Sequence, residues 1–361
     1  MVGEKGGAEV SMIHHCRLLD RSRFTPAAVL LRPGPFEKEL KAVGTETYVL
    51  QQHRRRNVVA VMRAVVQIAR LAREQGFDLL NSNVFPAHLY GGWAARLAGI
   101  PAVGTFHTVE HPGLLTTATL AIPISHVVAN NPKSTQFFRD HGKPTTMIWP
   151  GVDIETLRHG TPRSELAARY GLPPEKRWIC MSGRLQRWKG QIEFIRTVAA
   201  LADDPGFHAV IVGGTLFGLE PAYQQELRAL AAELNVSHRV TFTGFVSDAD
   251  LAGLIGSSYV TVHPARDEDF GLSVAEAQAL GIPTIAFAAI GPANIIDHMK
   301  TGWVVPIGDQ QTLNESLRTA LRSPDLVARM GVAARERTAR LFSLEQYMRQ
   351  FEEVYSKVLG H

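Results

Sequence analysis

Short apolar runs alternate with helix-length segments along nearly the whole chain, and this alternation limits the possible folds more than any other feature. The expected strands lie at 27–31, 77–83, 101–107, 126–130, 178–183, 208–214, 239–244, 259–264, 283–288 and 302–306. Amphipathic segments separate them, among them 56–75, 189–203, 219–235 and 309–322. Repetition of strand, helix and strand favours parallel sheets that helices cover on both faces. We therefore expect an α/β fold.

Two domains are expected, because 361 residues exceed what one ordinary hydrophobic core holds. Pro150 and Gly151 end one strand before a new helical segment begins, and they mark the break. We predict a Rossmann-like domain over 1–149, a second over 150–342, and a final helix over 343–361 that packs back on the first domain. Two doubly wound domains leave a cleft at the carboxyl ends of their strands, where ligands bind in this architecture.

The cysteines and the apolar runs indicate the cellular compartment of the protein. Cys16 and Cys180 each lie in an apolar segment, which favours two buried thiols in a reducing cytoplasm over a disulfide. No run of 18 or more apolar residues occurs, so no membrane-spanning helix is expected. The first residues lack the long apolar core of a secretory signal. These features together predict a cytoplasmic protein.

Basic residues are concentrated in the first half of the chain. Residues 1–150 carry 17 Lys and Arg against 10 Asp and Glu, whereas the remainder carries 21 against 24. The net charges of +7 and −3 indicate an anionic partner for the first half, such as a phospholipid, a lipid diphosphate or a polyanion. A solvated basic face is the alternative. No basic-aromatic motif for nucleic acid occurs, so we expect no nucleic-acid partner.

The segment 56–75 combines charge with an apolar face. Arg56, Arg63 and Arg70 form one stripe of the expected helix. The opposite stripe comprises Val58, Val61, Met62, Val65 and Ile68. This pattern suits peripheral contact with the anionic inner face of a membrane. A helix that covers the first sheet and exposes a basic face to water explains the same pattern.

A glycine and two cations follow the strand at 178–183, in the stretch GRLQRWKG. Gly183 allows a sharp turn, and Arg184 and Lys189 leave the strand end together. We expect Lys189 to open a helix, whose amino end carries partial positive charge. Two cations beside a helix start suit a diphosphate, at roughly 1.5–3 kcal/mol for each charge-assisted hydrogen bond. The alternative is two exposed basic side chains in a loop. Neither a Walker loop nor a dinucleotide glycine fingerprint is present.

Two carboxylates stand eight residues apart in RDEDFGLSVAEAQALG, residues 266–281. Glu268 lies in a loop after a strand, and Phe270 and Gly271 start a helix that contains Glu276. Gly271 lets a ligand approach the free amides at the helix start. Two cations that bind a diphosphate and two carboxylates that accept hydrogen bonds from hydroxyl groups are together suited to a nucleotide sugar. Two glutamates on a solvated helix would not explain the apolar residues between them.

These motifs resemble the retaining glycosyltransferases of family 4, which have the GT-B fold. The stretch RDEDFGLSVAEAQALGIPTIA resembles their Glu-x7-Glu signature, and GRLQRWKG their Arg and Lys pair. TFTGFVSDADLAGLI resembles the segment that contacts the nucleobase, and GTFHT the loop with a functional histidine. The closing helix resembles their crossover helix. The resemblance covers nearly the whole chain, and it implies an acceptor-side first domain and a nucleotide-sugar-binding second domain.

The resemblance also implies a role for each matching residue. Arg184 and Lys189 would hold the diphosphate, Glu276 the ribose hydroxyls and Glu268 the hydroxyls of the transferred hexose. His107 would contact the donor sugar or the attacking hydroxyl; a core histidine is the alternative. The remaining expected contacts are Gly6, Gly7, Gly183, Phe245, Val246, Phe270, Gly271 and Leu272.

One departure from the family concerns the start of the chain. The family opens with a strand before its glycine loop, whereas this chain reaches Gly6 and Gly7 after five residues. We therefore expect the first strand of the N-terminal domain to be missing or very short.

A second motif, Asp248-Ala249-Asp250, matches the metal motif of a different transferase fold. We interpret it instead as a helix start capped by Ser247 or Asp248, and we expect no obligatory metal and no other cofactor. The predicted activity is transfer of a hexose from a UDP-sugar, or second from GDP-mannose, to a glycan, glycolipid or small molecule, as in cell-envelope polysaccharide synthesis. A GT-B epimerase or hydrolase and an inactive binding subunit are the alternatives.

Overall fold

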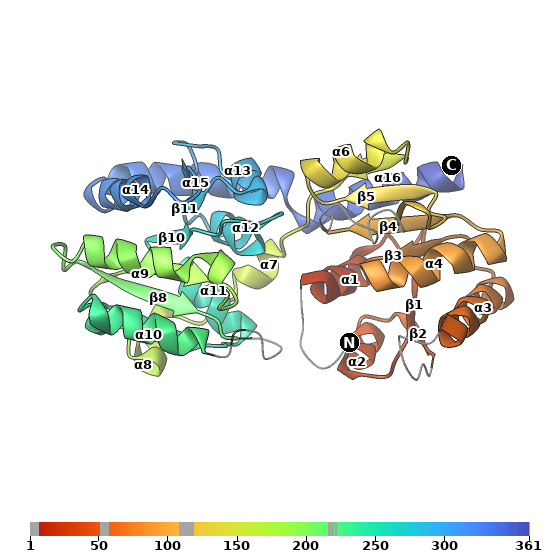
Figure 1. Cartoon of the computed structure of the whole chain (residues 1–361), viewed down its shortest axis with the longest axis horizontal. Coiled ribbons are helices and arrows are strands. Elements are labelled where there is room, and N and C mark those ends of the chain that lie inside the picture. The colour runs from red at the N-terminus through yellow and green to blue at the C-terminus, as the bar shows by residue number, and fades with distance from the viewer. Residues whose placement is uncertain (1–6, 51–57, 108–118, 216–219, 221, 361) are drawn as a thin grey trace. The chain divides into compact units, whose positions relative to one another are not determined.

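The fold is that of a computed structural model, which describes residues 7–50, 58–107, 119–215, 220 and 222–360 (Figure 1). The chain divides into two compact units. The first consists of Met1–Gly151 together with Leu344–His361, and the second of Val152–Ser343. Each unit is an α/β structure with parallel strand pairs, and the last helix belongs to the first unit.

The first unit begins with a helix rather than a strand in its described part. Its elements are α1 (Gly7–Leu18), β1 (Ala27–Leu30), α2 (Pro35–Ala42), β2 (Glu46–Val49), α3 (Val58–Gln75), β3 (Leu80–Ser82), α4 (Phe85–Ala98), β4 (Ala102–Phe106), β5 (His126–Ala129), α6 (Pro132–Asp140), β6 (Thr145–Met147) and α16 (Leu344–Leu359). The expected strands did not include β2, because the run ETYV has only half-buried or exposed residues and no strong apolar signal. The strand expected to end at Pro150 and Gly151 is β6, which is three residues long and ends at Met147.

The strands of the first unit form two separate parallel sheets. Strands β1 and β2 pair with each other, and the second sheet has the order β3-β4-β5-β6. We expected one doubly wound sheet, so the division is a finding of the structure. Figure 1 shows β1 and β2 side by side, and their described residues have no ladder with β3.

Helix α16 packs into the core of the first unit through its apolar stripe. Tyr347, Phe351 and Tyr355 are buried in one cluster with Val103 of β4 and Val128 of β5. The hydroxyl of Tyr355 also lies 2.6 Å from His15 Nε2 of α1. Tertiary packing of this apolar stripe stabilises α16. The last helix of the chain therefore belongs to the first unit.

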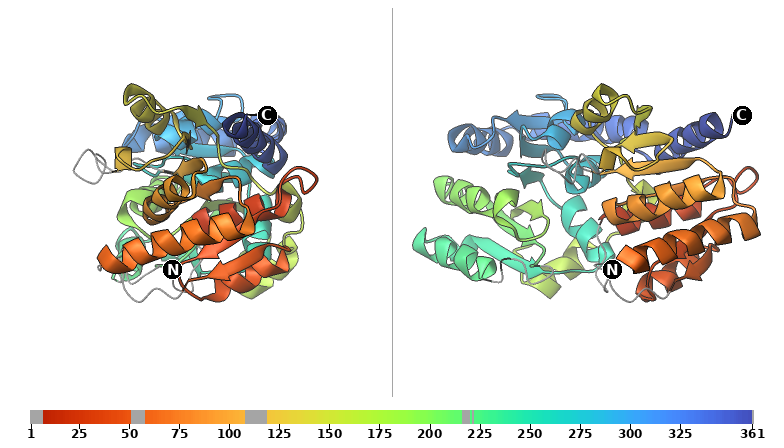
Figure 2. Two further views of the ribbon diagram at one scale, coloured as in Figure 1. Left: turned by 90° about the vertical axis from the view of Figure 1, so that its right-hand side faces the viewer. Right: turned by 45° about the vertical axis from the view of Figure 1, so that its right-hand side comes forward.

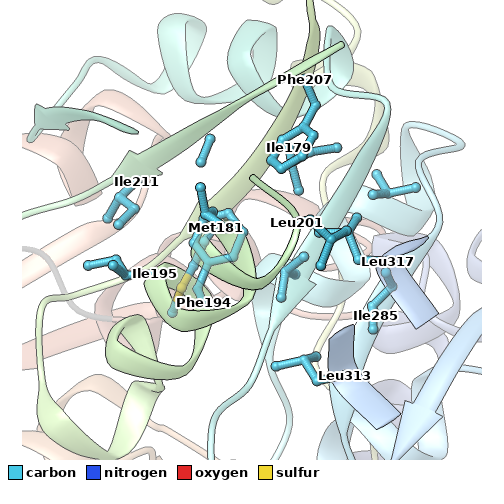
Figure 3. Packing of buried hydrophobic residues seen from close by; sticks show 14 of the residues in the cluster. Ile179, Met181, Phe194, Ile195, Leu201, Phe207, Ile211, Ile285, Leu313 and Leu317 are labelled. Atoms are coloured by element: carbon cyan, nitrogen blue, oxygen red, sulfur yellow. The ribbon is translucent and has the colours of Figure 1, made fainter. Parts of the chain in front are cut away.

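The second unit holds one six-stranded parallel sheet. Its elements are α7 (Ile154–Leu157), α8 (Arg163–Tyr170), β7 (Arg177–Ser182), η1 (Arg187–Lys189), α9 (Gln191–Ala200), β8 (Phe207–Val212), α10 (Tyr223–Glu233), η2 (Ser237–Arg239), β9 (Val240–Gly244), α11 (Asp248–Gly256), β10 (Val260–His263), α12 (Leu272–Ala279), β11 (Thr284–Phe287), α13 (Ile290–Ile295), β12 (Gly302–Val305), α14 (Gln310–Arg322) and α15 (Pro324–Leu341). The sheet order is β12-β11-β10-β7-β8-β9. Figure 3 shows Met181 of β7 packed with Phe194 of α9, and Ile179 of β7 beside Phe207 of β8, in the main core.

Helix α3 differs from the expectation for its apolar stripe. Val65 and Ile68 are buried, as are Ala64, Ala69 and Ala72, but Val58 and Met62 are 75% and 57% exposed. The buried face therefore combines Val65 and Ile68 with three alanines, and the alanines let α3 approach α4 closely. The two helices lie side by side in Figure 2. Arg56 lies outside the described residues.

Two further expectations concern the thiols and the membrane. Cys16 and Cys180 are both free and buried, which confirms the predicted buried thiols. Among the described residues, no helix combines the length and the hydropathy that crossing a membrane requires.

Candidate functional site

The sheet of the second unit has a point where the strand order reverses. From β7 the chain adds β8 and β9 on one side, and it then crosses back to add β10, β11 and β12 on the other. Strands β7 and β10 are therefore neighbours, with Ile179 opposite Val260. In open α/β sheets, ligands bind outside the carboxyl ends of the strands at such a reversal. Both motifs found in the sequence follow these two strands.

The loop after β7 turns at a glycine and carries the first motif. Gly183 has a φ of 151°, a conformation that L side chains rarely adopt. The prediction that Lys189 opens a helix is wrong: Lys189 ends the short η1, and α9 begins at Gln191. The reason is Gly190, whose φ of 88° interrupts the helical backbone between them.

The loops after β7 and β10 pack closely against each other and share a backbone hydrogen bond. A Cβ atom on Gly190 would lie 2.1 Å from the carbonyl oxygen of Pro264, so only glycine permits this approach. The backbone N–H of Arg266 donates a hydrogen bond to the carbonyl of Trp188 at 2.9 Å. Residues that are far apart in the sequence are thereby held in one local structure.

Lys189 and Glu268 form an ion pair between these loops. Lys189 Nζ lies 2.5 Å from Glu268 Oε2, and both side chains are mostly buried, with 13% and 14% exposure. His263, the last residue of β10, also donates from Nε2 to Glu268 Oε2 at 3.2 Å. Burial opposes ionisation of Glu268, but the hydrogen bond from His263 and the charge of Lys189 outweigh it and lower its pKa to about 2. Glu268 is thus a fixed carboxylate.

Arg184 and Arg187 lie in the same loop but have different surroundings. Arg187 forms ion pairs with Glu220 and Glu226, the latter at 2.5 Å. Arg184 is exposed, and its guanidinium has no ion-pair partner within the described part of the chain. Its carbonyl is held by Gln191, which donates from Nε2 at 2.9 Å. Arg184 is therefore a cation on an anchored backbone that is available to an anionic ligand.

Helix α12 begins at Leu272, directly after its cap residue Gly271, where the sequence predicts a helix start. Gly271 has a φ of 90° and provides no side-chain cap, so the first amides of α12, from Leu272 onward, have no partner from a capping side chain. The ring of Phe270 is buried and packs edge-on against the ring of Phe342, with 5.8 Å between the two ring centroids. This contact fixes the position of Phe270 ahead of the helix. This arrangement leaves a helix amino end at the same strand end as Glu268.

Glu276 lies in α12, one turn beyond its start. Burial, together with the nearby charge of Asp248, raises its pKa to about 7. The two glutamates of the motif therefore differ: Glu268 is ionised at any working pH, whereas Glu276 titrates near neutrality.

The ends of β8 and β9 contribute an exposed aromatic ring. Phe245, directly after β9, is 59% exposed. Its ring lies over Gly214, where a Cβ atom would approach it to 2.7 Å. Val246, which sequence reasoning grouped with Phe245, packs against the hydrophobic core beside Leu166 and Leu254 instead. Phe245 alone thus offers a flat apolar surface.

The Asp-x-Asp motif is a helix start. Ser247 caps α11 by accepting a hydrogen bond from the amide of Asp250, which agrees with the predicted cap. The carboxylate of Asp250 accepts hydrogen bonds from Thr161, Tyr170 and Arg169, each at 2.5–2.6 Å. Its oxygens are therefore occupied by structural partners.

His107 follows β4 in the first unit, as expected, and sequence reasoning missed its neighbours. Asn130, the residue after β5, donates from Nδ2 to His107 Nδ1 at 2.6 Å, so the ring proton is on Nε2. His88 is buried and stacks on Phe106; burial, together with the proximity of His107, lowers the pKa of His88 to about 3. Gly7 is the first residue of α1, and Gly6 lies outside the described residues.

His263 and Asn130 had a sequence signal that went unused. Each is a polar residue at the last or second-last position of an expected strand, as in YVTVHP and HVVAN. The carboxyl ends of parallel strands meet at one edge, so such residues are candidates for the same reason as His107.

Two family profiles cover most of the chain. Residues 5–156 match the family described as Glycosyltransferase Family 4, and residues 162–337 match the one described as Glycosyl transferases group 1. The chain is a family 4 glycosyltransferase. The two matched segments meet near the boundary between the two units.

Curated relatives of the glycosyltransferase include several named D-inositol 3-phosphate glycosyltransferase. That of Streptomyces scabiei is 28% identical over 333 residues, which is 86% of this chain and 74% of the relative. That of Mycobacterium bovis is 29% identical over 338 residues, which is 84% of this chain and 68% of the relative.

Solved structures also match the glycosyltransferase. Anabaena Alr3699/HepE in complex with UDP has a TM-score of 0.85 and 26% identity, over 99% of this chain and 98% of that one. A glycosyltransferase from Rickettsia africae has a TM-score of 0.88 and 21% identity, over 98% and 96%, and it supports the fold. These likenesses agree with the predicted GT-B architecture.

Proposed function

We propose that this glycosyltransferase moves a hexose from a nucleotide diphosphate sugar to an acceptor hydroxyl with retention of the anomeric configuration. The observation that carries the proposal is the pairing of Lys189 with Glu268 at the point where the strand order reverses. A cation suited to phosphate and a carboxylate suited to sugar hydroxyls are held side by side there.

Each residue of this site has a proposed role. Arg184 and Lys189 bind the diphosphate and stabilise the negative charge that it gains as the bond to the sugar breaks. Glu268 accepts hydrogen bonds from hexose hydroxyls, and Glu276 accepts them from the ribose. The amides of Phe270, Gly271 and Leu272 contact sugar and phosphate beside the turn at Gly183, and Phe245 lies against the base. Attack from the face that the diphosphate leaves needs no enzyme nucleophile, so catalysis is mainly positioning and electrostatics.

A UDP-sugar is the proposed donor, with GDP-mannose second. The proposal is supported by the likeness to Anabaena Alr3699/HepE, which has been solved with UDP and, at 25% identity, with UDP-glucose. That likeness extends over 99% of this chain, so it includes the loops after β7 and β10.

The proposed acceptor is a glycan, a glycolipid or a small polyhydroxylated molecule. The names of the curated relatives add D-inositol 3-phosphate to the compounds worth testing. His107 is the group proposed to contact the acceptor or the donor sugar. Because Asn130 occupies Nδ1, His107 would act through the Nε2–H as a hydrogen-bond donor.

We also propose peripheral contact with an anionic membrane through α3 and α4. Exposed apolar side chains lie on both helices: Val59, Met62 and Val66 on α3, and Leu89, Trp93 and Leu97 on α4. Arg73 near the end of α3 donates to the carbonyl of Leu97, which joins the two helices. Arg63 and Arg70 of α3 and Arg96 of α4 are also exposed, and Arg70 is paired with Glu74. Exposed apolar side chains together with basic ones on the same helices suit a lipid headgroup region.

Product analysis tests the proposed reaction. UDP-glucose, UDP-N-acetylglucosamine and GDP-mannose are each incubated with the full chain, with and without an acceptor panel that contains inositol 3-phosphate. We expect nucleoside diphosphate release that depends on the acceptor, and a glycoside whose NMR coupling constants match the donor's anomer. Release of free sugar or of an epimerised donor without acceptor would establish the hydrolase or epimerase instead. Donor binding without any turnover would favour an inactive subunit.

A further inference from the structure

Arg266 connects the loop that carries Glu268 to the helix that follows Lys189. It lies two positions before Glu268, in the loop after β10. Its guanidinium donates to Glu193 Oε1 from Nη2 at 2.8 Å and from Nε at 3.2 Å. Glu193 lies in the first turn of α9, which begins two residues after Lys189. The ion pair therefore joins the two loops at a point outside the contact between Lys189 and Glu268.

The backbone of Arg266 makes a second contact, which leads to Lys189. Its N–H donates to the carbonyl of Trp188. The indole ring of Trp188 lies against the ammonium group of Lys189, with 4.3 Å between Nζ and the ring centroid. An aromatic face attracts a cation at this distance. Arg266 thus holds the backbone of the residue whose ring helps to orient Lys189.

Glu193 is a fixed anchor for the guanidinium. Its side chain is 12% exposed, and the amino end of a helix favours a negative charge. Gln310 of α14 donates from Nε2 to the carbonyl of Glu193 at 3.2 Å and to Thr197 Oγ1 at 2.8 Å. A buried carboxylate is costly unless a cation pairs with it, and Arg266 supplies that cation.

The backbone of Glu268 is held at another point, on α13. The N–H of Gly291 donates to the carbonyl of Glu268 at 2.8 Å. Gly291 also packs so closely on the carbonyl oxygen of Phe270 that a Cβ atom there would lie 1.9 Å from it. The loop is therefore held on α13 through its backbone and on α9 through the charge of Arg266.

We propose that Arg266, through its pairing with Glu193, is a positioning residue that keeps Lys189 and Glu268 at the separation at which both bind one donor. The inference rests on the proposed function, in which the diphosphate contacts Lys189 and the hexose contacts Glu268. The side chain of Arg266 is 51% exposed, so its removal leaves no cavity in the hydrophobic core. Its loss should therefore disturb the two loops while the core of the second unit stays packed.

Three variants isolate this ion pair. Arg266→Met removes the cation, and Glu193→Gln removes the carboxylate charge at nearly constant shape. The double variant leaves no buried carboxylate without its cation, so it stays folded even where Arg266→Met alone does not. Arg318→Met is the matched control. Its ion pair with Asp203, at 3.0 Å, joins α14 to the residues after α9, at the opposite end of α9 from Lys189.

Calorimetry and kinetics distinguish positioning from stabilisation of the fold. We expect each variant to lose about tenfold in UDP affinity and in kcat, because a displaced binding group loses its aligned contacts. Uridine affinity should stay near its original value, since Phe245 and Glu276 are proposed to bind the nucleoside. The double variant should lose no more than the worse single variant, because both changes break one contact. Arg266→Lys should recover part of the loss, since an ammonium group can still pair with Glu193.

Hydrogen exchange of the Gly291 amide is a readout that needs neither ligand nor turnover, because this amide donates to Glu268. Exchange should be about tenfold faster in the three variants and unchanged in Arg318→Met. Equal losses of UDP and uridine affinity would overturn the proposal, as would unchanged UDP affinity with unchanged exchange. An unmodified chain that bound neither UDP nor GDP would contradict the proposed function instead. The exchange of Gly291 would then decide by itself whether Arg266 holds the loop.

Discussion

Lys189 Nζ lies 2.5 Å from Glu268 Oε2 and joins the loop after β7 to the loop after β10. The pair neutralises both charges, and the nearby Arg184 has no ion-pair partner within the described part of the chain. An incoming diphosphate would therefore meet Arg184 as a free cation and Lys189 as a cation already shared with Glu268. The first prediction therefore concerns Arg184.

The first prediction concerns the diphosphate. Arg184→Ala should weaken binding of a nucleoside diphosphate far more than binding of the nucleoside, and turnover should fall on the order of 10²-fold, the scale for removal of one electrostatic donor. Calorimetry with UDP and uridine measures the difference. Arg187→Ala is the matched control, since this cation is already paired with Glu226, and it should leave both affinities near their original values. Equal losses for UDP and uridine in Arg184→Ala would contradict the assignment.

A second prediction concerns His263, which donates to Glu268 and is buried. Without this hydrogen bond the pKa of Glu268 should rise and its carboxylate should lose its fixed position. We expect His263→Ala to reduce transfer by about 10- to 100-fold, the equivalent of roughly 1.5–3 kcal/mol for a hydrogen bond to a charged group. Binding of UDP should change little. His208→Ala serves as the control, because this buried histidine lies near the amino end of β8 and contacts Thr241. A similar loss in both variants would indicate only a general effect on folding.

The pH dependence of binding provides a third prediction. Burial and Asp248 raise the pKa of Glu276 to about 7, so its carboxylate forms as the pH rises through neutrality. Uridine affinity should therefore increase between about pH 6 and pH 8 if the ionised form binds the ribose. Glu276→Gln should remove this dependence, and Asp248→Asn should shift it to lower pH. A flat profile in the unmodified protein would count against the ribose assignment.

The raised pKa of Glu276 also affects stability. It lowers the free energy of unfolding as the pH rises, whereas the lowered pKa of an ordinary paired carboxylate increases that free energy. The unfolded Glu276 ionises near the usual pKa of 4.5, whereas the folded one retains its proton up to about pH 7. The unfolded state therefore binds fewer protons in this window, and the contribution of Glu276 to the free energy of unfolding falls as the pH rises through it. Urea titrations of the original protein and Glu276→Gln at pH 5 and pH 8 measure this change.

Metal independence is a fourth prediction. Asp250, the second acid of the Asp-x-Asp motif, is occupied by Thr161, Arg169 and Tyr170. We expect transfer to survive EDTA, with the leaving diphosphate stabilised by Arg184 and Lys189. Loss of activity in EDTA and its recovery with Mn²⁺ or Mg²⁺ would show that a metal takes part.

The last prediction concerns the membrane. Sedimentation with phosphatidylglycerol vesicles at low salt should exceed that with phosphatidylcholine vesicles, and added salt should reduce it as the charges are screened. Met62→Asp and Trp93→Asp, at exposed apolar positions of α3 and α4, should each weaken binding. Val332→Asp, at an exposed apolar position of the second unit, is the control. Indifference to lipid charge would favour contact with a soluble acceptor.

Local features of the fold could be predicted from the sequence because they depend on neighbouring residues. The strand at 178–183 became β7, and the helix start at Gly271 became the start of α12. Apolar periodicity and the φ freedom of glycine are encoded within a few residues. Lys189 failed as a helix start because Gly190, packed on Pro264 far along the chain, decides where α9 begins.

The sequence alone determined the class of fold, the two motifs and the resemblance to family 4, since all three depend on residue order and spacing. Only the tertiary structure decided which of these side chains meet. Lys189 and Glu268 are 79 residues apart and become neighbours because the sheet order puts β10 beside β7. The open edges of β1 and β3 and the exposed face of α3 were likewise decided by packing, because burial and strand order are properties of the whole sheet.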